Sequence, residues 1–376
     1  MNLNKARIGL ALSGGGIRAA CYHLGVLQYF AEAGLFNQIT SISSVSGGSL
    51  CVGAIFAANH NKWPAADKFI EVVRPKVRGL ILNSDIQTSA LRRIPFSFWF
   101  WNNKVGLIAK MLEKKWGIKG SLQDLPKQPY WEINSTIFET GNGFRCRRDF
   151  MGDYTIGYVQ QPDLPISHMI AASASFPILI GPYILKTKGM NWTKDKMGDE
   201  GPIIVDSKYT LWDGGVYDNL GLEALYKIGR GLDEEIDFLV ISNASASIAH
   251  KKRRVGLSLR NMARLLGIAM SQVDDLRTRD VMAYVMSEGK GIYLKIGSSA
   301  GKIAEDFKIP PEKAKPMIEN CLSEKDITKA RDYATTLKTP SPENFDLIFR
   351  HGYENAKCVY LCETYSRNKF SEHLFA

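Results

Sequence analysis

A serine inside a run of small residues is the first feature of this sequence that suggests chemistry. The run Ser-Ser-Val-Ser-Gly-Gly-Ser at residues 43–49 follows a short alternating stretch and precedes a mostly apolar stretch at residues 50–58. This order is typical of a strand, a sharp turn and a helix, and the strained turn accepts only small residues two positions before and after the exposed serine. Ser46 has Ser44 and Gly48 at those positions, so we predict that Ser46 is a nucleophile.

A glycine loop near the N-terminus supplies a second candidate feature. Residues 8–13 predict a buried strand, residues 14–16 are three glycines, and a helix is expected from about Ile17 to Ala33. Glycines between a strand and a helix let backbone N–H groups converge beside the positive end of the helix, which favours an anion. We therefore expect Gly14, Gly15 and Gly16 to bind a developing negative charge, with Gly47 as a further donor.

The same glycines formally fit a dinucleotide-binding fingerprint, since Gly14-x-Gly16-x-x-Ala19 matches G-x-G-x-x-G/A. That fold needs an acidic residue about 20 positions further on, at the end of the second strand. Here the second strand ends in Ser43-Ser44, which makes nucleotide binding the weaker interpretation.

The base for the serine is expected from a strand that ends at Asp213. The stretch 209–213 reads as a short apolar strand, Gly214 and Gly215 follow it, and a helix capped by Asn219 is expected next. A carboxylate at a strand end is placed to meet groups on neighbouring strand ends, so Asp213 could accept the Ser46 proton. A turn aspartate is the alternative for Asp213, and Asp218 competes for the role of base, but capping is the function we expect of it.

Histidine does not provide a better base. None of the six histidines has strand-end surroundings like those of Asp213. His351 stands where a hydrolase triad would place its histidine, but its neighbours predict a helix. His23 lies on the helix after the glycine loop and is expected to be a packing or surface residue. A direct Ser46–Asp213 dyad is therefore our preferred hypothesis.

Together the three motifs resemble those of the patatin-like phospholipases. The glycine loop with Ile17 and Arg18, the Ser44–Gly48 stretch around Ser46, and the run Asp213-Gly214-Gly215 occur in the family's order within residues 7–243. Two departures are Ser44, in place of the first glycine of the serine turn, and Ala19, where a glycine commonly follows the basic residue. Neither removes a catalytic atom.

The resemblance implies a three-layer α/β/α fold with a mostly parallel central sheet. It also implies metal-free and cofactor-free hydrolysis of acyl esters in phospholipids or related lipids by a Ser–Asp dyad without histidine. Arg18 is expected to steady the glycine loop or to meet a phosphate. The alternative is a catalytically silent protein of the same fold that binds a lipid or a nucleotide.

Charge and aromatic residues concentrate in residues 60–130, which we interpret as a cap or insertion within one catalytic domain spanning residues 1–376. This segment holds 13 basic and 5 acidic residues, so it carries most of the net charge of +10. Its aromatic run at 94–101 suits either the interface of an anionic membrane or a buried cap element. The charge alone would also fit a nucleic-acid binder, with strongly salt-dependent binding, but we expect no nucleic-acid partner.

The C-terminal part at residues 244–376 is predicted to be mainly helical, and regulation is a role we consider for it. A basic run at 251–254 precedes its first expected helix. The six cysteines form no Cys-x-x-Cys pair, which suits reduced thiols in the cytosol. Without a signal-peptide pattern or an apolar run of membrane-spanning length, we expect a cytoplasmic or peripheral membrane protein, with leaderless export left open.

Overall fold

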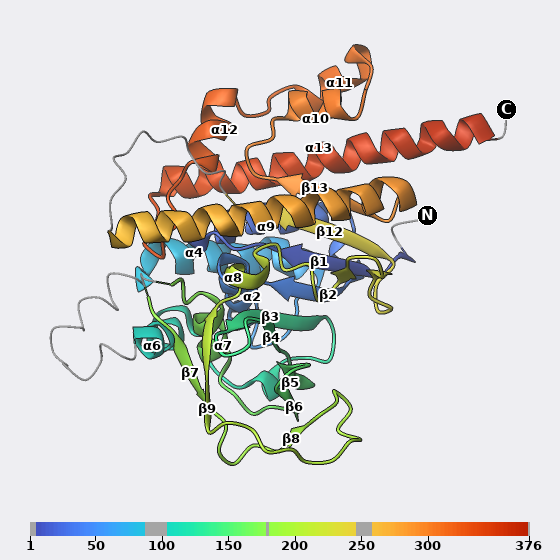
Figure 1. Ribbon diagram of the computed structural model, residues 1–376. Helices are drawn as coiled ribbons and strands as arrows, with labels where there is room; N and C mark the ends of the chain where they lie inside the picture. Colours follow the sequence, from blue (N-terminus) through green and yellow to red (C-terminus); the bar gives the residue numbers. More distant parts are fainter. Residues whose placement is uncertain (1–4, 87–103, 178–179, 246–257, 375–376) are drawn as a thin grey trace.

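A computed structural model describes residues 5–86, 104–177, 180–245 and 258–374 of the chain (Figure 1). Its centre is an eleven-stranded mixed sheet with the order β13-β12-β1-β2-β3-β4-β5-β6-β8, in which β9 pairs with β3 and with β7. The parallel strands are β1 (Ile8–Leu12), β2 (Ile39–Ser44), β3 (Tyr130–Ile137), β12 (Phe238–Asn243) and β13 (Gly291–Lys295).

Helices cover both faces of the parallel strands. The side chains of a strand point alternately to the two faces of the sheet, and here apolar side chains occur on both faces, so each face needs a covering layer. On one face Leu10, Leu12 and Val240 belong to the main core, which also contains residues of α1 (Gly16–Glu32) and α13 (Pro342–Leu374). Side chains that point to the other face, such as Leu239 and Ile241, form a second core with α9 (Leu259–Glu288) and with residues 220–236. Both cores support the predicted three-layer α/β/α fold with a mostly parallel central sheet.

Helix α13 packs against α1 at very short range. A Cβ atom added to Gly25 of α1 would lie 2.0 Å from the carbonyl oxygen of Phe349, and one added to Gly352 of α13 would lie 2.1 Å from that of Tyr22. The two glycines therefore set the distance between these helices, and through it the position of α1 behind the glycine loop.

The rest of the sheet is antiparallel and lies in the lower part of Figure 1, away from the C-terminal helices. These strands are β4 (Gly143–Cys146), β5 (Phe150–Asp153), β6 (Gly157–Gln160), β7 (Tyr183–Lys186), β8 (Trp192–Thr193) and β9 (Lys208–Asp213). Strand β4 is short, because the chain turns again before Phe150, where β5 begins.

The described residues between the parallel strands β2 and β3 are mostly helical, and α4 packs on α2 (Gly47–Ala58) while α6 packs on α7 (Ile166–Ser173). The aromatic run at 94–101 and the basic run at 251–254 lie outside the described residues. The elements of the connection are α3 (Ala66–Lys68), η3 (Phe69–Val73), α4 (Arg74–Asn83), α6 (Lys104–Trp116) and η6 (Leu122–Asp124).

The described residues of the C-terminal part, 258–374, are mainly helical, with the single strand β13 among the helices. Within the described residues, no helix is long and apolar enough to cross a membrane. The remaining short elements are η2 (Phe36–Gln38), α8 (Gly215–Asp218), β10 (Tyr226–Lys227), β11 (Gly231–Leu232), α10 (Ala300–Asp306), α11 (Pro311–Ile318) and α12 (Glu324–Arg331).

Candidate active site

Ser46 sits at a strained turn between β2 and α2, as the sequence predicts. Its φ and ψ are 50° and −110°, a conformation that a non-glycine residue adopts only where the surroundings enforce it. The turn is pressed against β1, since the Val45 N–H donates to the Leu12 carbonyl at 3.0 Å. A Cβ on Gly48 would lie 2.5 Å from the same oxygen, which explains the need for a glycine there. The Ser46 residue is 8% exposed.

Strand register brings Asp213 to Ser46. β2 runs parallel to β3 and its last residue, Ser44, lies opposite Ile133. β9 runs antiparallel to β3 on the continuation of the same edge, and its last residue, Asp213, lies opposite Ser135. The carboxyl ends of β2 and β9 therefore face each other across a short gap, and Ser46 follows β2 into that gap.

The Asp213 carboxyl group is buried and hydrogen-bonded. Burial raises its pKa to about 7, while hydrogen bonds from the Ser46 side chain and from the Gly215 N–H, the latter at 2.8 Å, act in the opposite direction. At neutral pH both the carboxylate and the acid are therefore populated, which suits a group that must take up and release a proton.

The glycine loop lies against the serine turn. A Cβ on Gly14 would lie 3.3 Å from the Ser46 Cβ, and one on Gly47 would lie 2.8 Å from the Gly16 nitrogen. Gly15 and Gly16 adopt φ values of 140° and 61°, which L side chains rarely adopt. In the described part of the chain, the N–H groups of Gly15, Gly16 and Gly47 have no acceptor, so all three are available to an anion.

Arg18 supports this loop from behind. The side chain is 2% exposed, and its guanidinium donates to the carbonyl oxygens of Ala244, at 3.1 Å, and of Tyr333. Burial lowers its pKa to about 10. Of the two roles considered for Arg18, these contacts favour steadying the loop, because both hydrogen bonds point into the protein.

Comparison with known proteins identifies the family of the chain. The family model "Patatin-like phospholipase" matches residues 10–226, more than half of the chain. The chain belongs to the patatin-like phospholipase family. Membership supports lipid hydrolysis as the general class of activity. No curated protein matches the sequence.

Solved structures share the fold at low sequence identity. Human GIVD cytosolic phospholipase A2 is 13% identical with a TM-score of 0.53, and the match covers 96% of this chain and 61% of that one. The same human protein in complex with methyl gamma-linolenyl fluorophosphonate inhibitor and terbium chloride is 12% identical with a TM-score of 0.50, covering 96% and 60%. The chain thus spans about three fifths of the length of these relatives.

Ser173 is a site residue that the sequence did not reveal. Its hydroxyl accepts the Ser46 N–H at 3.0 Å and contacts the Ser49 hydroxyl at 3.0 Å. Ser49 in turn contacts Ser44 at 2.9 Å, so the serine in place of the first glycine of the turn belongs to a buried hydroxyl chain. The segment directly after α7 also positions Asp213, because the Asp213 N–H donates to the Ser175 carbonyl. The only signal in the sequence was the run of small residues at 171–177.

Asn219 is not the N-cap of a helix after Asp213, contrary to the prediction, but the residue that ends the short helix α8 (Gly215–Asp218). The only helix there is the single turn α8 before Asn219, and Gly221 at φ 70° ends any helical continuation. The Asn219 carbonyl instead accepts the Gly14 N–H at 3.0 Å, and its side-chain amide donates to Asp274 of α9 at 3.0 Å. Asp218 accepts the Glu223 N–H at 2.8 Å at the end of α8, so it holds a turn rather than a helix start.

The buried histidines are structural. His23 donates from Nε2 to the Ser13 carbonyl at 3.0 Å, so its Nδ1 accepts from the Ser242 hydroxyl at 2.8 Å. His351 accepts the Gly297 N–H at 2.8 Å. Burial lowers the pKa of each to about 4. Among the described residues, no group of His, Cys, Asp and Glu side chains could hold a metal ion.

Proposed function

We propose that this protein is a serine hydrolase that cleaves acyl ester bonds of phospholipids or related lipids, with Ser46 and Asp213 as a catalytic dyad. The observation that carries the proposal is the hydrogen bond between Ser46, held at a strained turn, and a buried carboxyl group whose pKa is raised to about 7. The adjoining glycine loop lies against the same turn, and its N–H groups that have no acceptor among the described residues would form the oxyanion hole.

In the first half of the reaction, the Ser46 hydroxyl oxygen attacks the ester carbonyl carbon and its proton passes to the Asp213 carboxylate. The carbonyl oxygen becomes an oxyanion that accepts hydrogen bonds from Gly15 and Gly16, with Gly47 as a further donor. When the intermediate collapses, the ester C–O bond breaks and Asp213 returns the proton to the leaving alkoxide.

In the second half, water attacks the acyl–Ser46 ester while Asp213 takes a proton from it. Collapse of this intermediate releases the fatty acid, and the proton returns to the serine oxygen. A single residue therefore acts as base and then as acid in each half, and a pKa near the working pH allows both.

The intact mass after exposure to a fluorophosphonate tests the dyad in wild type, Ser46→Ala and Asp213→Asn. A single adduct in wild type that is absent from Ser46→Ala and strongly slowed in Asp213→Asn is the expected result. Labelling of Ser46→Ala at the wild-type rate would contradict the proposal. No adduct in wild type, with or without anionic vesicles, would favour the catalytically silent lipid- or nucleotide-binding protein instead.

A further inference from the structure

A cavity of about 490 Å³ lies beside the acid motif on the face of the sheet that residues 220–236 cover. Its lining includes Gly214, which follows Asp213, and Ser135, which lies opposite Asp213 in the β3–β9 pair. The cavity wall therefore includes the same backbone that positions the proposed base.

Three cations line this cavity without a carboxylate partner at ion-pair distance in the described part of the chain: Lys196, Lys227 and Arg230. Lys227 and Arg230 are joined by one tight turn, in which the Arg230 N–H donates to the Lys227 carbonyl at 2.9 Å. The Lys196 ammonium lies over the Phe150 ring, 4.7 Å from its centre.

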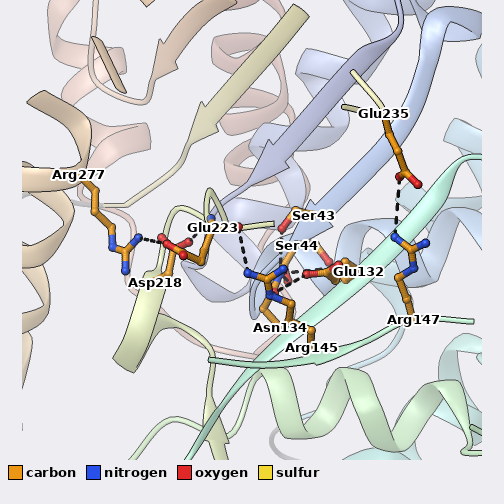
Figure 2. A network of polar contacts seen from close by, with 10 residues as sticks. All are labelled: Ser43, Ser44, Glu132, Asn134, Arg145, Arg147, Asp218, Glu223, Glu235 and Arg277. Atoms are coloured by element: carbon orange, nitrogen blue, oxygen red, sulfur yellow. Dashed lines mark hydrogen bonds and ion pairs between the residues drawn. The ribbon is translucent and has the colours of Figure 1, made fainter. Parts of the chain in front are cut away.

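The acidic side chains of the cavity already have partners. Glu223 forms an ion pair with Arg277 at 2.9 Å, and Figure 2 shows this pair beside Asp218. Asp153 accepts the N–H groups of residues 155 and 156. Burial raises the pKa of the Asp218 carboxyl, and the nearby positive charge of Arg277 opposes this shift. The lining therefore presents an excess of positive charge.

The cations of this cluster repel one another. The pKa of Lys196 is lowered by burial first and then by the positive charges of Arg145, Lys227 and Arg147, against a single opposing contribution from Glu132. A bound anion would relieve this repulsion. Arg145 extends the cluster toward the strands, with its guanidinium between Glu132, at 3.4 Å, and the Glu223 carbonyl (Figure 2).

Apolar side chains at this cavity suit a lipid. Tyr154 is 76% exposed and Ile228 is 59% exposed, and both line the cavity, Ile228 within the turn that carries Lys227 and Arg230. Exposed apolar groups beside cations are typical of surfaces that contact phospholipid. A free phosphate ion would make no use of them.

We infer that this cavity binds the phosphate of a phospholipid headgroup through Lys196, Lys227 and Arg230. The inference rests on the proposed function, because it names the headgroup chemistry of the substrate whose ester would lie at Ser46. Ammonium and guanidinium groups that line one cavity suit phosphate, which accepts charge-assisted hydrogen bonds from both.

The test compares dihexanoylphosphatidic acid with dihexanoylglycerol, two substrates that differ in the phosphate. Lys227→Gln/Arg230→Gln is the variant, and Lys186→Gln/Lys208→Gln is the matched control, since those two exposed lysines face each other in the β7–β9 pair outside the cavity. We expect the variant to lose about tenfold or more in kcat/KM on the phosphatidic acid, since each charge-assisted hydrogen bond contributes that much, and to keep wild-type activity on dihexanoylglycerol.

An equal loss on both substrates, an equal loss in the control, or no loss would overturn the inference. Calorimetry with inorganic phosphate, in the Ser46→Ala background, separates the sources of phosphate. If the variant loses phosphate binding but keeps its substrate preference, the site takes free phosphate and the headgroup assignment is wrong. If wild type hydrolyses neither ester, the proposed function fails, and binding of dihexanoylphosphatidic acid to Ser46→Ala with and without the cavity substitutions still decides this inference.

Discussion

Replacing Asp213 with asparagine should lower activity strongly and stabilise the folded protein at alkaline pH. The two side chains have nearly the same shape, and the asparagine oxygen can still accept the Gly215 N–H that Asp213 accepts at 2.8 Å. The amide group would face Ser46 and let the serine oxygen accept a hydrogen bond. What the substitution removes is the cost of holding a carboxylate in a buried site.

The magnitude follows from the pKa of Asp213. Its value rises from 3.8 to about 7 on folding. At about 1.4 kcal/mol per pKa unit, ionised Asp213 destabilises the folded state by about 4 kcal/mol, which is an upper value for the gain. Below pH 3.8 Asp213 is protonated in both the folded and the unfolded state, so its burial carries no ionisation cost. Because the pKa is higher in the folded state, the stability of the folded state falls as pH rises above 3.8, and this loss is complete above about pH 7. The difference between variant and wild type should thus be near zero at pH 4 and largest at pH 8.

Urea unfolding at pH 4 and at pH 8 measures this difference, and esterase assays on the same samples measure the loss of the base, about 10² to 10⁴ in rate. Asp195→Asn is a useful control, because the exposed Asp195 carboxylate accepts four backbone N–H groups, which lower its pKa from 3.8. The stability that this carboxylate contributes is present above about pH 3.8 and is lost only below it, so Asp195→Asn should destabilise the protein by nearly the same amount at pH 4 and at pH 8. A gain for Asp213→Asn that is the same at both pH values would refute the reasoning.

Three further results are expected. Ser173→Ala should cost about 1–3 kcal/mol of stability and lower kcat, because the buried N–H of Ser46 loses its acceptor; urea unfolding and steady-state kinetics check both, and unchanged kcat would show that the turn holds without this bond. Gly352→Ala should destabilise the protein through a clash with a backbone oxygen of α1 and lower its melting temperature. Gly267→Ala, with nothing within 4 Å of its Cβ, should raise the free energy of unfolding by up to about 1 kcal/mol through helix propensity, and so raise the melting temperature. Burial lowers the pKa of His23 from 6.5 to about 4, so the stability that neutral His23 contributes is complete above pH 6.5 and is lost as pH falls toward 4. The free energy of unfolding of His23→Gln should therefore change less between pH 6.5 and pH 4 than that of wild type.

The parts of the site that the sequence predicted are those with local signals. The strand, glycine loop and helix at residues 8–32 and the strand, turn and helix around Ser46 each occupy one continuous stretch in which small residues mark the turn. Asp213 could be placed at a strand end for the same reason. Its approach to Ser46 depends on the strand pairing, because β2 pairs with the first half of β3 and β9 pairs with the second half on the same edge. This pairing joins segments that are distant in the sequence, so no local pattern predicts it.

The parts that escaped prediction depend on partners far away in the chain. Ser173 lies 127 residues from Ser46, and an isolated serine in a run of small residues carries no sign of what it bonds. Asn219 was interpreted as a helix cap because that is its commonest local use. In the structure the Asn219 side-chain amide donates hydrogen bonds to Asp274 and Ser245. Gly221, at a positive φ, prevents a helix from continuing beyond it.

The C-terminal part takes part in the construction of the glycine loop, although the family model ends at residue 226. The Ile17 N–H donates to the Thr336 carbonyl at 2.8 Å, and a Cβ on Gly16 would lie 2.5 Å from that oxygen. Arg18 bonds the Tyr333 carbonyl from the same side. Because the directions of the loop N–H groups are set by this contact, a shift of residues 333–336 would change the geometry offered to an oxyanion. The regulatory role considered for the C-terminal part would act by this route, through the backbone that carries the proposed oxyanion hole.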